Sequence, residues 1–346
     1  MKKILLVLLC ACALTACRHE NKRSYWDAEM EPQQVEIVRF DKALLSIRTD
    51  NAQNTKEDIQ SLYDSEPEFM TFWVENIMGI PAEDTALLVQ NLPLYLNDTI
   101  YGFKKTNELE QVIFADITDL QSSLDKAFTR IKHLYPNVFI PAIELFPSIF
   151  VTSLISLDAE HFIGVGADMY LGSDYPLYDQ VVYDYQRQGM RKECIPVDVT
   201  LNYLNEVLPY PDKQNCLLEQ MLWRGRVMYL TAQILDELPG YEVMGWTKEQ
   251  WDWSIRYEAN IWHKIMDQQA LYKRDNLLIS HYLNEAPFTT EIVSDETDQD
   301  SPGRLGIWIG WRIVESYMEH HPEVTLQELM AEPDAQKILK LSLYQP

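Results

Sequence analysis

Two arginines stand in an otherwise apolar stretch near the end of the chain. The segment SPGRLGIWIGWRIV (301–314) predicts a helix that is apolar nearly all round, and such a helix is normally buried. Arg304 and Arg312 lie two turns apart on it. A buried guanidinium needs carboxylate partners or a ligand. The two arginines are therefore either members of structural ion pairs or parts of a binding site.

The same stretch carries signals for the start and the packing of its helix. Ser301 is a good N-cap and Pro302 suits the first helical position. Gly306 and Gly310 are unfavourable inside a helix and lie four residues apart on one face. We therefore predict a helix that begins near Pro302, with another backbone approaching closely at the two glycines.

A second candidate is the acid in the segment FIGVGADMYLG (162–172). Asp168 interrupts a run that reads as an apolar strand, and it can either bond neighbouring backbone at the strand end or face a ligand. Gly164 and Gly166 predict close approach to one face of this strand.

Familiar catalytic motifs are missing from the sequence. None of the 7 histidines forms the His-Glu-x-x-His pattern of zinc hydrolases, and the nucleophile elbow Gly-x-Ser-x-Gly and the P-loop are also missing. Asp295, Asp298 and Asp300 could hold calcium but lack EF-hand spacing, so a solvated acidic loop is favoured. We predict no catalytic residues, no metal and no cofactor, although 53 acids leave a carboxylate pair possible in principle.

The beginning of the chain has the three parts of a bacterial lipoprotein leader. Lys2 and Lys3 precede the apolar run 4–14, and Leu14-Thr15-Ala16 precede Cys17. We predict a signal peptide over 1–16, lipid on Cys17, a tether over 17–34 and a single domain over 35–346. Arg18 after the cysteine favours the outer membrane, and the lack of an acidic cluster favours its periplasmic face.

Cysteine use is compatible with an exported protein, and the net charge restricts the class of partner. Cys194 and Cys216 remain after the lipidated residue, and either a disulfide or two free thiols is compatible with an exported protein. The net charge of -24 argues against nucleic acid, which needs clustered Lys and Arg. The expected partners are the membrane, through the lipid, and envelope proteins.

The elements that must position these residues are mostly helical. Residues 35–40 and a hairpin over 148–172 read as strands, while 55–145 reads mostly as helix. Further helices are predicted at 217–235, 277–283 and after Thr247, which with Gln250 fits a capping box. The predicted fold is one α+β domain, predominantly α-helical, with a small antiparallel sheet.

Several of these segments together resemble the gliding-motility lipoprotein family GldB. The matching parts are the lipobox at Cys17, VRFD at 38–41, FIGVGADMYLG at 162–172, EAPF at 285–288 and DSPGRLG at 300–306. The resemblance implies an envelope lipoprotein linked with gliding and its secretion machinery, and it implies no agreed enzymatic activity. The family also looks distantly similar to zincin-like peptidases, in which an edge strand aligns the substrate above a helix that carries the zinc ligands.

In this chain the corresponding helix, from Leu217, contains no histidine, which removes the metal and its activated water. What remains is a groove for a peptide, with a strand available for β-augmentation. We expect Asp168, Tyr170, Arg304 and Arg312 to line this groove. The favoured function is a non-catalytic, protein-binding envelope lipoprotein. The alternatives are a peptidase-like or peptidoglycan hydrolase, or a structural subunit of an envelope complex.

Overall fold

The computed structural model describes residues 25–26, 28–158, 162–208, 210, 216–285 and 301–346. The chain divides into two compact units, Met1–Met30 and Glu31–Pro346, and the features described below belong to the second. The predicted signal peptide, the lipid site Cys17 and the calcium candidates Asp295, Asp298 and Asp300 lie outside the described residues.

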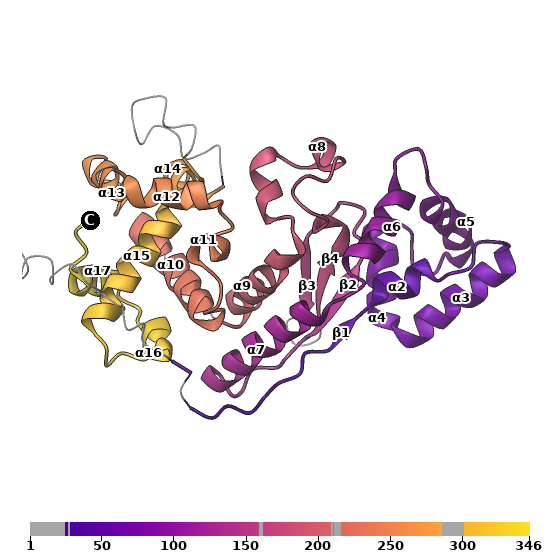
Figure 1. The fold of residues 1–346 in the computed structure, drawn as a ribbon, viewed down its shortest axis with the longest axis horizontal. Coiled ribbons are helices and arrows are strands. Elements are labelled where there is room, and N and C mark those ends of the chain that lie inside the picture. Colours follow the sequence, from indigo (N-terminus) through magenta and orange to yellow (C-terminus); the bar gives the residue numbers. More distant parts are fainter. Residues whose placement is uncertain (1–24, 27, 159–161, 209, 211–215, 286–300) are drawn as a thin grey trace, which may run out of the picture. The chain divides into compact units, whose positions relative to one another are not determined.

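Helices account for most of the second unit, as predicted (Figure 1). The longer helices are α3 (Ala52–Ser65), α5 (Thr85–Leu96), α6 (Phe103–Ile113), α7 (Thr118–Leu134), α9 (Ile195–Val207), α10 (Leu217–Ile234), α12 (Lys248–Arg256), α13 (Glu258–Asp267), α14 (Asn276–Leu283), α15 (Leu305–His320) and α17 (Ala335–Ser342). The shorter ones are α2 (Phe40–Leu45), α4 (Pro67–Phe72), η1 (Trp73–Ile77), η2 (Ala167–Met169), α8 (Tyr178–Val181), η3 (Asp184–Gly189), η4 (Lys192–Cys194), α11 (Gly240–Val243) and α16 (Leu326–Ala331).

The four strands form one mixed sheet in the order β1-β2-β4-β3. The strands are β1 (Ile37–Val38), β2 (Ala142–Phe146), β3 (Leu154–Asp158) and β4 (Phe162–Gly166). Figure 1 shows β2, β4 and β3 side by side. β1, β2 and β4 run parallel, and β3 is antiparallel to β4 at the outer edge, with Leu154 opposite Val165.

The sheet differs from the prediction in three ways. It is mixed and not antiparallel, because the helical segment between β1 and β2 acts as a crossover that lets β1, β2 and β4 run parallel, and only β3 is antiparallel. β2 was expected to be part of a helical region, but its five residues are almost all apolar and lie centrally between two parallel neighbours. Strands buried on both faces have such continuous apolar runs, which cannot be told from helix by period. The predicted hairpin exists, but residues 148–153 form a loop and its first strand starts only at Leu154. Its second strand ends at Gly166, so Asp168 lies in the short helix η2 and not in a strand.

Aromatic side chains fill the core beside the sheet. Phe69 makes edge-on contacts with Phe40, Phe146 and Phe162 at centroid distances of 4.8 to 5.2 Å. The indole N–H of the fully buried Trp73 donates to the carbonyl of Pro147, 2.9 Å away. This core joins the first helices to β2 and β4 and fixes the end of the sheet from which the loop 147–153 departs.

Glycines bring α10 and α15 into backbone contact. A Cβ on Gly310 would lie 2.0 Å from the Met221 carbonyl oxygen, and one on Gly225 would lie 2.3 Å from the Gly310 carbonyl carbon. A Cβ on Gly306 would meet the Tyr282 carbonyl oxygen at 2.9 Å. The predicted close approach at Gly306 and Gly310 is therefore confirmed, with α14 and α10 as the partners.

Candidate functional site

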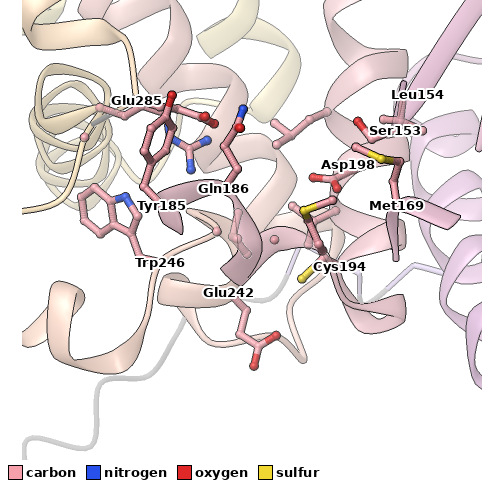
Figure 2. A pocket seen from close by; sticks show the side chains of 18 of the residues that line it. Ser153, Leu154, Met169, Tyr185, Gln186, Cys194, Asp198, Glu242, Trp246 and Glu285 are labelled. Atoms are coloured by element: carbon pink, nitrogen blue, oxygen red, sulfur yellow. The ribbon is translucent and has the colours of Figure 1, made fainter. Parts of the chain in front are cut away.

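A cavity of about 410 Å³ opens beside the start of β3 (Figure 2). Four parts of the chain contribute its wall: Ser153 and Leu154 at the edge strand with Met169 and Tyr170 after β4, the segment from Val182 to Asn202, the segment from Glu242 to Gln250, and Glu285 with residues 302–304. Its lining mixes apolar, aromatic and charged side chains, as ligand sites commonly do.

The buried Tyr170 and the half-buried Asp198 form a hydrogen-bonded pair in this wall. Tyr170 is 2% exposed, and its hydroxyl donates to Oδ2 of Asp198 at 2.9 Å. Asp198 lies in the first turn of α9, where a carboxylate is favoured by the helix dipole. Burial raises the pKa of Asp198 to about 6, although the Tyr170 hydrogen bond and the charge of Arg304 act in the opposite direction. The Asp198 carboxylate is thus held in place by Tyr170, but Tyr170 and Arg304 do not fully offset the cost of burying its negative charge.

Arg304 lies on the same wall, at the residue before α15 begins. Its backbone is left-handed, with φ 62°, and its N–H donates to the Asn284 carbonyl at 2.8 Å. The guanidinium donates to the Met244 carbonyl. Burial lowers the pKa of Arg304, whereas the charges of Glu285 and Asp198 raise it. The acids that attract Arg304 are Glu285, from the segment before the helix, and Asp198 of α9.

The helix start was predicted wrongly. Ser301 and Pro302 do not cap it, and α15 begins three residues later at Leu305. The reason is the left-handed Arg304, which bends the chain just before the helix and directs residues 302–304 into the cavity wall.

Asp168 does not line the cavity; it holds the loop that leads there. It is 2% exposed, and its two carboxylate oxygens accept from the backbone N–H groups of Ser148 and Phe150, both at 2.7 Å. Ile149 and Phe150 have positive φ values of 55° and 58°, which are unfavourable for such side chains. Burial raises the pKa of Asp168 and these hydrogen bonds oppose the rise. This is the backbone-bonding role that the sequence allowed.

Arg312 lies in a different place from Arg304. Its Nε donates to Oε1 of Glu258 at 3.0 Å, and it also pairs with Glu315. The Tyr344 hydroxyl donates to the same Glu258 oxygen at 2.8 Å. Arg312 therefore belongs to an ionic network that ties α13, α15 and the C-terminal residues together.

Sequence reasoning missed most of the cavity residues. Asp198 was not singled out, although it is an acid within the apolar helix sequence IPVDVTL (195–201), which was a usable signal. Glu285 was noted only as part of EAPF.

Both Cys194, on the cavity wall, and Cys216 are free thiols, and burial raises the pKa of Cys194 to about 11. A thiol with a raised pKa is a poor nucleophile.

Comparison with known proteins decides the family. The family model for the gliding motility protein GldB matches residues 21–346. The chain belongs to the GldB family. Comparison with curated proteins and with solved structures gave no match. Membership implies a gliding motility protein of a lipoprotein family.

Two further findings concern this GldB-family chain. Within the described residues, no group of three or more His, Cys, Asp and Glu side chains is arranged to hold a metal ion. No helix in the described part of the chain is both long and apolar enough to cross a membrane.

The left-handed backbone of Arg304 leads to a testable prediction. Arg304→Ala should lower the free energy of unfolding by about 2 kcal/mol, because the half-buried Asp198 and the nearby Glu285 lose the counter-charge that Arg304 provides. Arg304→Gly should be more stable than the alanine variant by about 1 kcal/mol, since glycine accepts a positive φ without a clash. Urea unfolding followed by circular dichroism measures both values. Equal stability of the two variants would show that the backbone at this position carries no strain.

Proposed function

We propose that this GldB-family protein is anchored by lipid on Cys17 to the periplasmic face of the outer membrane. There it binds an extended segment of a partner protein and does not act as a catalyst. The proposed partner is a component of the motility and secretion machinery of the envelope. The observation that carries the proposal is a cavity that lies beside an edge strand. The strand offers backbone pairing, and the cavity offers a place for a side chain.

The edge strand supports pairing with a peptide. In an antiparallel ladder, alternate residues direct their N–H and C=O groups toward and away from the partner strand. Ser153 accepts from the Gly166 N–H at 2.9 Å, so Ser153 faces β4. Leu154 and Ser156 therefore direct their backbone groups away from β4, toward the outer edge. The Leu154 carbonyl accepts there from the Thr152 hydroxyl at 2.7 Å, so a peptide that adds as a further strand would accept from the Leu154 N–H.

The arrangement also suits the distant likeness to zincin-like peptidases. Those enzymes align their substrate on an edge strand, and β3 is an antiparallel edge strand here. The helix α10 carries none of their histidine ligands. We propose that the chain keeps the means of aligning a peptide and lacks the means of cleaving it.

A proline at the sheet edge tests this proposal. Leu154→Pro removes one outward N–H, and proline is tolerated on edge strands, so the fold should persist. Leu154→Ala removes the same side chain but keeps the N–H, and serves as the matched control. The probe is an array of randomised heptapeptides, acetylated and amidated, scored with the purified chain.

We expect the proline variant to bind the selected peptides at least tenfold more weakly than the alanine variant, with melting temperatures within a few degrees. Equal binding by the two variants would contradict pairing through β3. If the unmodified chain selects no peptide, the proposed function is wrong.

A further inference from the structure

We propose that the cavity receives one positively charged side chain, lysine or arginine, from the bound segment, and that Asp198 and Glu285 hold its charge. The inference rests on the proposed function, because the side chain arrives as part of a peptide aligned on β3. It adds the chemical class that the cavity selects.

The charges of the lining favour a cation. Three carboxylates, Asp198, Glu242 and Glu285, stand against one guanidinium, Arg304. Glu242 has a cation of its own nearby, since Arg191 lies 3.9 Å away. In Figure 2 the side chain of Glu242 points away from the other two acids, while Asp198 and Glu285 lie on opposite sides of the cavity.

The half-buried Asp198 and the exposed Glu285, taken with Arg304, leave one negative charge uncompensated. Arg304 interacts with both acids, but its guanidinium is also engaged by the Met244 carbonyl, which fixes it to one wall. An uncompensated charge in a partly buried site is unfavourable, and a single ligand cation would neutralise it. The raised pKa of Asp198 agrees with this reading, because Arg304 alone does not restore the ordinary value.

The geometry of Asp198 leaves an oxygen for the ligand. Tyr170 donates to Oδ2, and we assign Oδ1 to the incoming ammonium or guanidinium group. This hydrogen bond orients the carboxylate before the ligand arrives, which limits the ordering cost of binding.

The rest of the wall fits the stem of such a side chain. Lysine and arginine carry apolar methylene stems that pack on apolar surface while the charged end finds its partner. Met169, Met190 and Leu201 line the cavity and can contact the stem. An acidic side chain would instead meet two carboxylates and a guanidinium that already has partners.

A short peptide series tests the inference. The probes are fluorescein-labelled, amidated heptapeptides of the sequence Ala-Val-Ala-X-Ala-Val-Ala, with X as lysine, arginine, norleucine or glutamate. Binding to the full chain is measured by fluorescence anisotropy. Lysine and arginine should bind at least tenfold more tightly than norleucine, and glutamate should bind most weakly.

Two variants assign the preference to the cavity. Asp198→Asn keeps an oxygen that can accept from Tyr170 but removes the charge, and it should reduce the lysine-over-norleucine ratio to below about threefold. Glu193→Gln, a matched loss of one charge at an exposed position outside the cavity, should leave the ratio unchanged. Melting temperatures of both variants check that the fold is retained.

The outcomes separate the two proposals. If norleucine binds as tightly as lysine, the cavity does not select a cation, while peptide binding stands. If the lysine preference survives Asp198→Asn, the cation is bound elsewhere and the inference is overturned. If none of the four peptides binds, the result contradicts the proposed function, and the array experiment on β3 tests that function independently.

Discussion

Gly310→Ala should destabilise the chain by at least about 3 kcal/mol. In an open helix this change is stabilising by about 1 kcal/mol, because alanine has the higher helix propensity. Here the added methyl would lie 2.0 Å from the Met221 carbonyl oxygen, which belongs to the backbone of α10. A backbone atom inside a buried helix cannot turn aside as a side chain can, so α10 and α15 must separate. The clash therefore decides the sign of the effect.

The measurement is urea unfolding of the variant beside Gly189→Ala. A Cβ at Gly189 meets no atom within 4 Å, and we expect that control to change the free energy of unfolding by less than about 1 kcal/mol. A Gly310→Ala protein as stable as the control would mean that the helix crossing is looser than the structure describes.

The glycine spacing shows how far sequence reasoning reached. Gly306 and Gly310, at successive turns of an apolar helix, sufficed to predict close backbone contact, because that inference needs only local geometry. The partner could not be predicted, since Met221 is far away along the chain. The start of the helix was missed because a non-glycine residue in the left-handed region, Arg304, follows from tertiary contacts and not from propensity.

The candidate site was predicted only in part for the same reason. Tyr170 and Arg304 lie on the cavity wall, but their acidic partners Asp198 and Glu285 come from two further segments. No spacing rule joins residues so distant in the sequence. Asp168 was recognisable because a single acid in an apolar run must bond something, and its partners, the backbone N–H groups of Ser148 and Phe150, precede it by 20 and 18 residues within the same predicted hairpin.

Glu144→Gln should stabilise the protein at pH 8 and make its stability less dependent on pH. Glu144 stands in the middle of β2, opposite Val38 on one side and Gly164 on the other. It is 4% exposed, and its Oε2 has no hydrogen-bond partner among the described residues. Burial, with smaller contributions from the charges of Glu66 and Glu36, raises its pKa from 4.5 to about 8. The folded protein thus favours the neutral acid.

The direction of the effect follows from proton linkage. Between pH 4.5 and 8 the folded state binds a proton at Glu144 that the unfolded state has released, so stability falls as pH rises through this window. At 1.36 kcal/mol per pKa unit, the fall between pH 5 and pH 8 is on the order of 3 kcal/mol. Glutamine imitates the neutral acid and does not ionise, so the variant should lack this fall, and its free energy of unfolding should exceed that of the original chain by a similar amount at pH 8.

Glu68→Gln, an exposed change on α4, should leave the dependence of stability on pH unaltered. Urea unfolding at pH 5, 6, 7 and 8 compares the three proteins. If the Glu144→Gln curve runs parallel to that of the original chain, the carboxylate is already ionised in the folded state and has a partner that the structure does not describe.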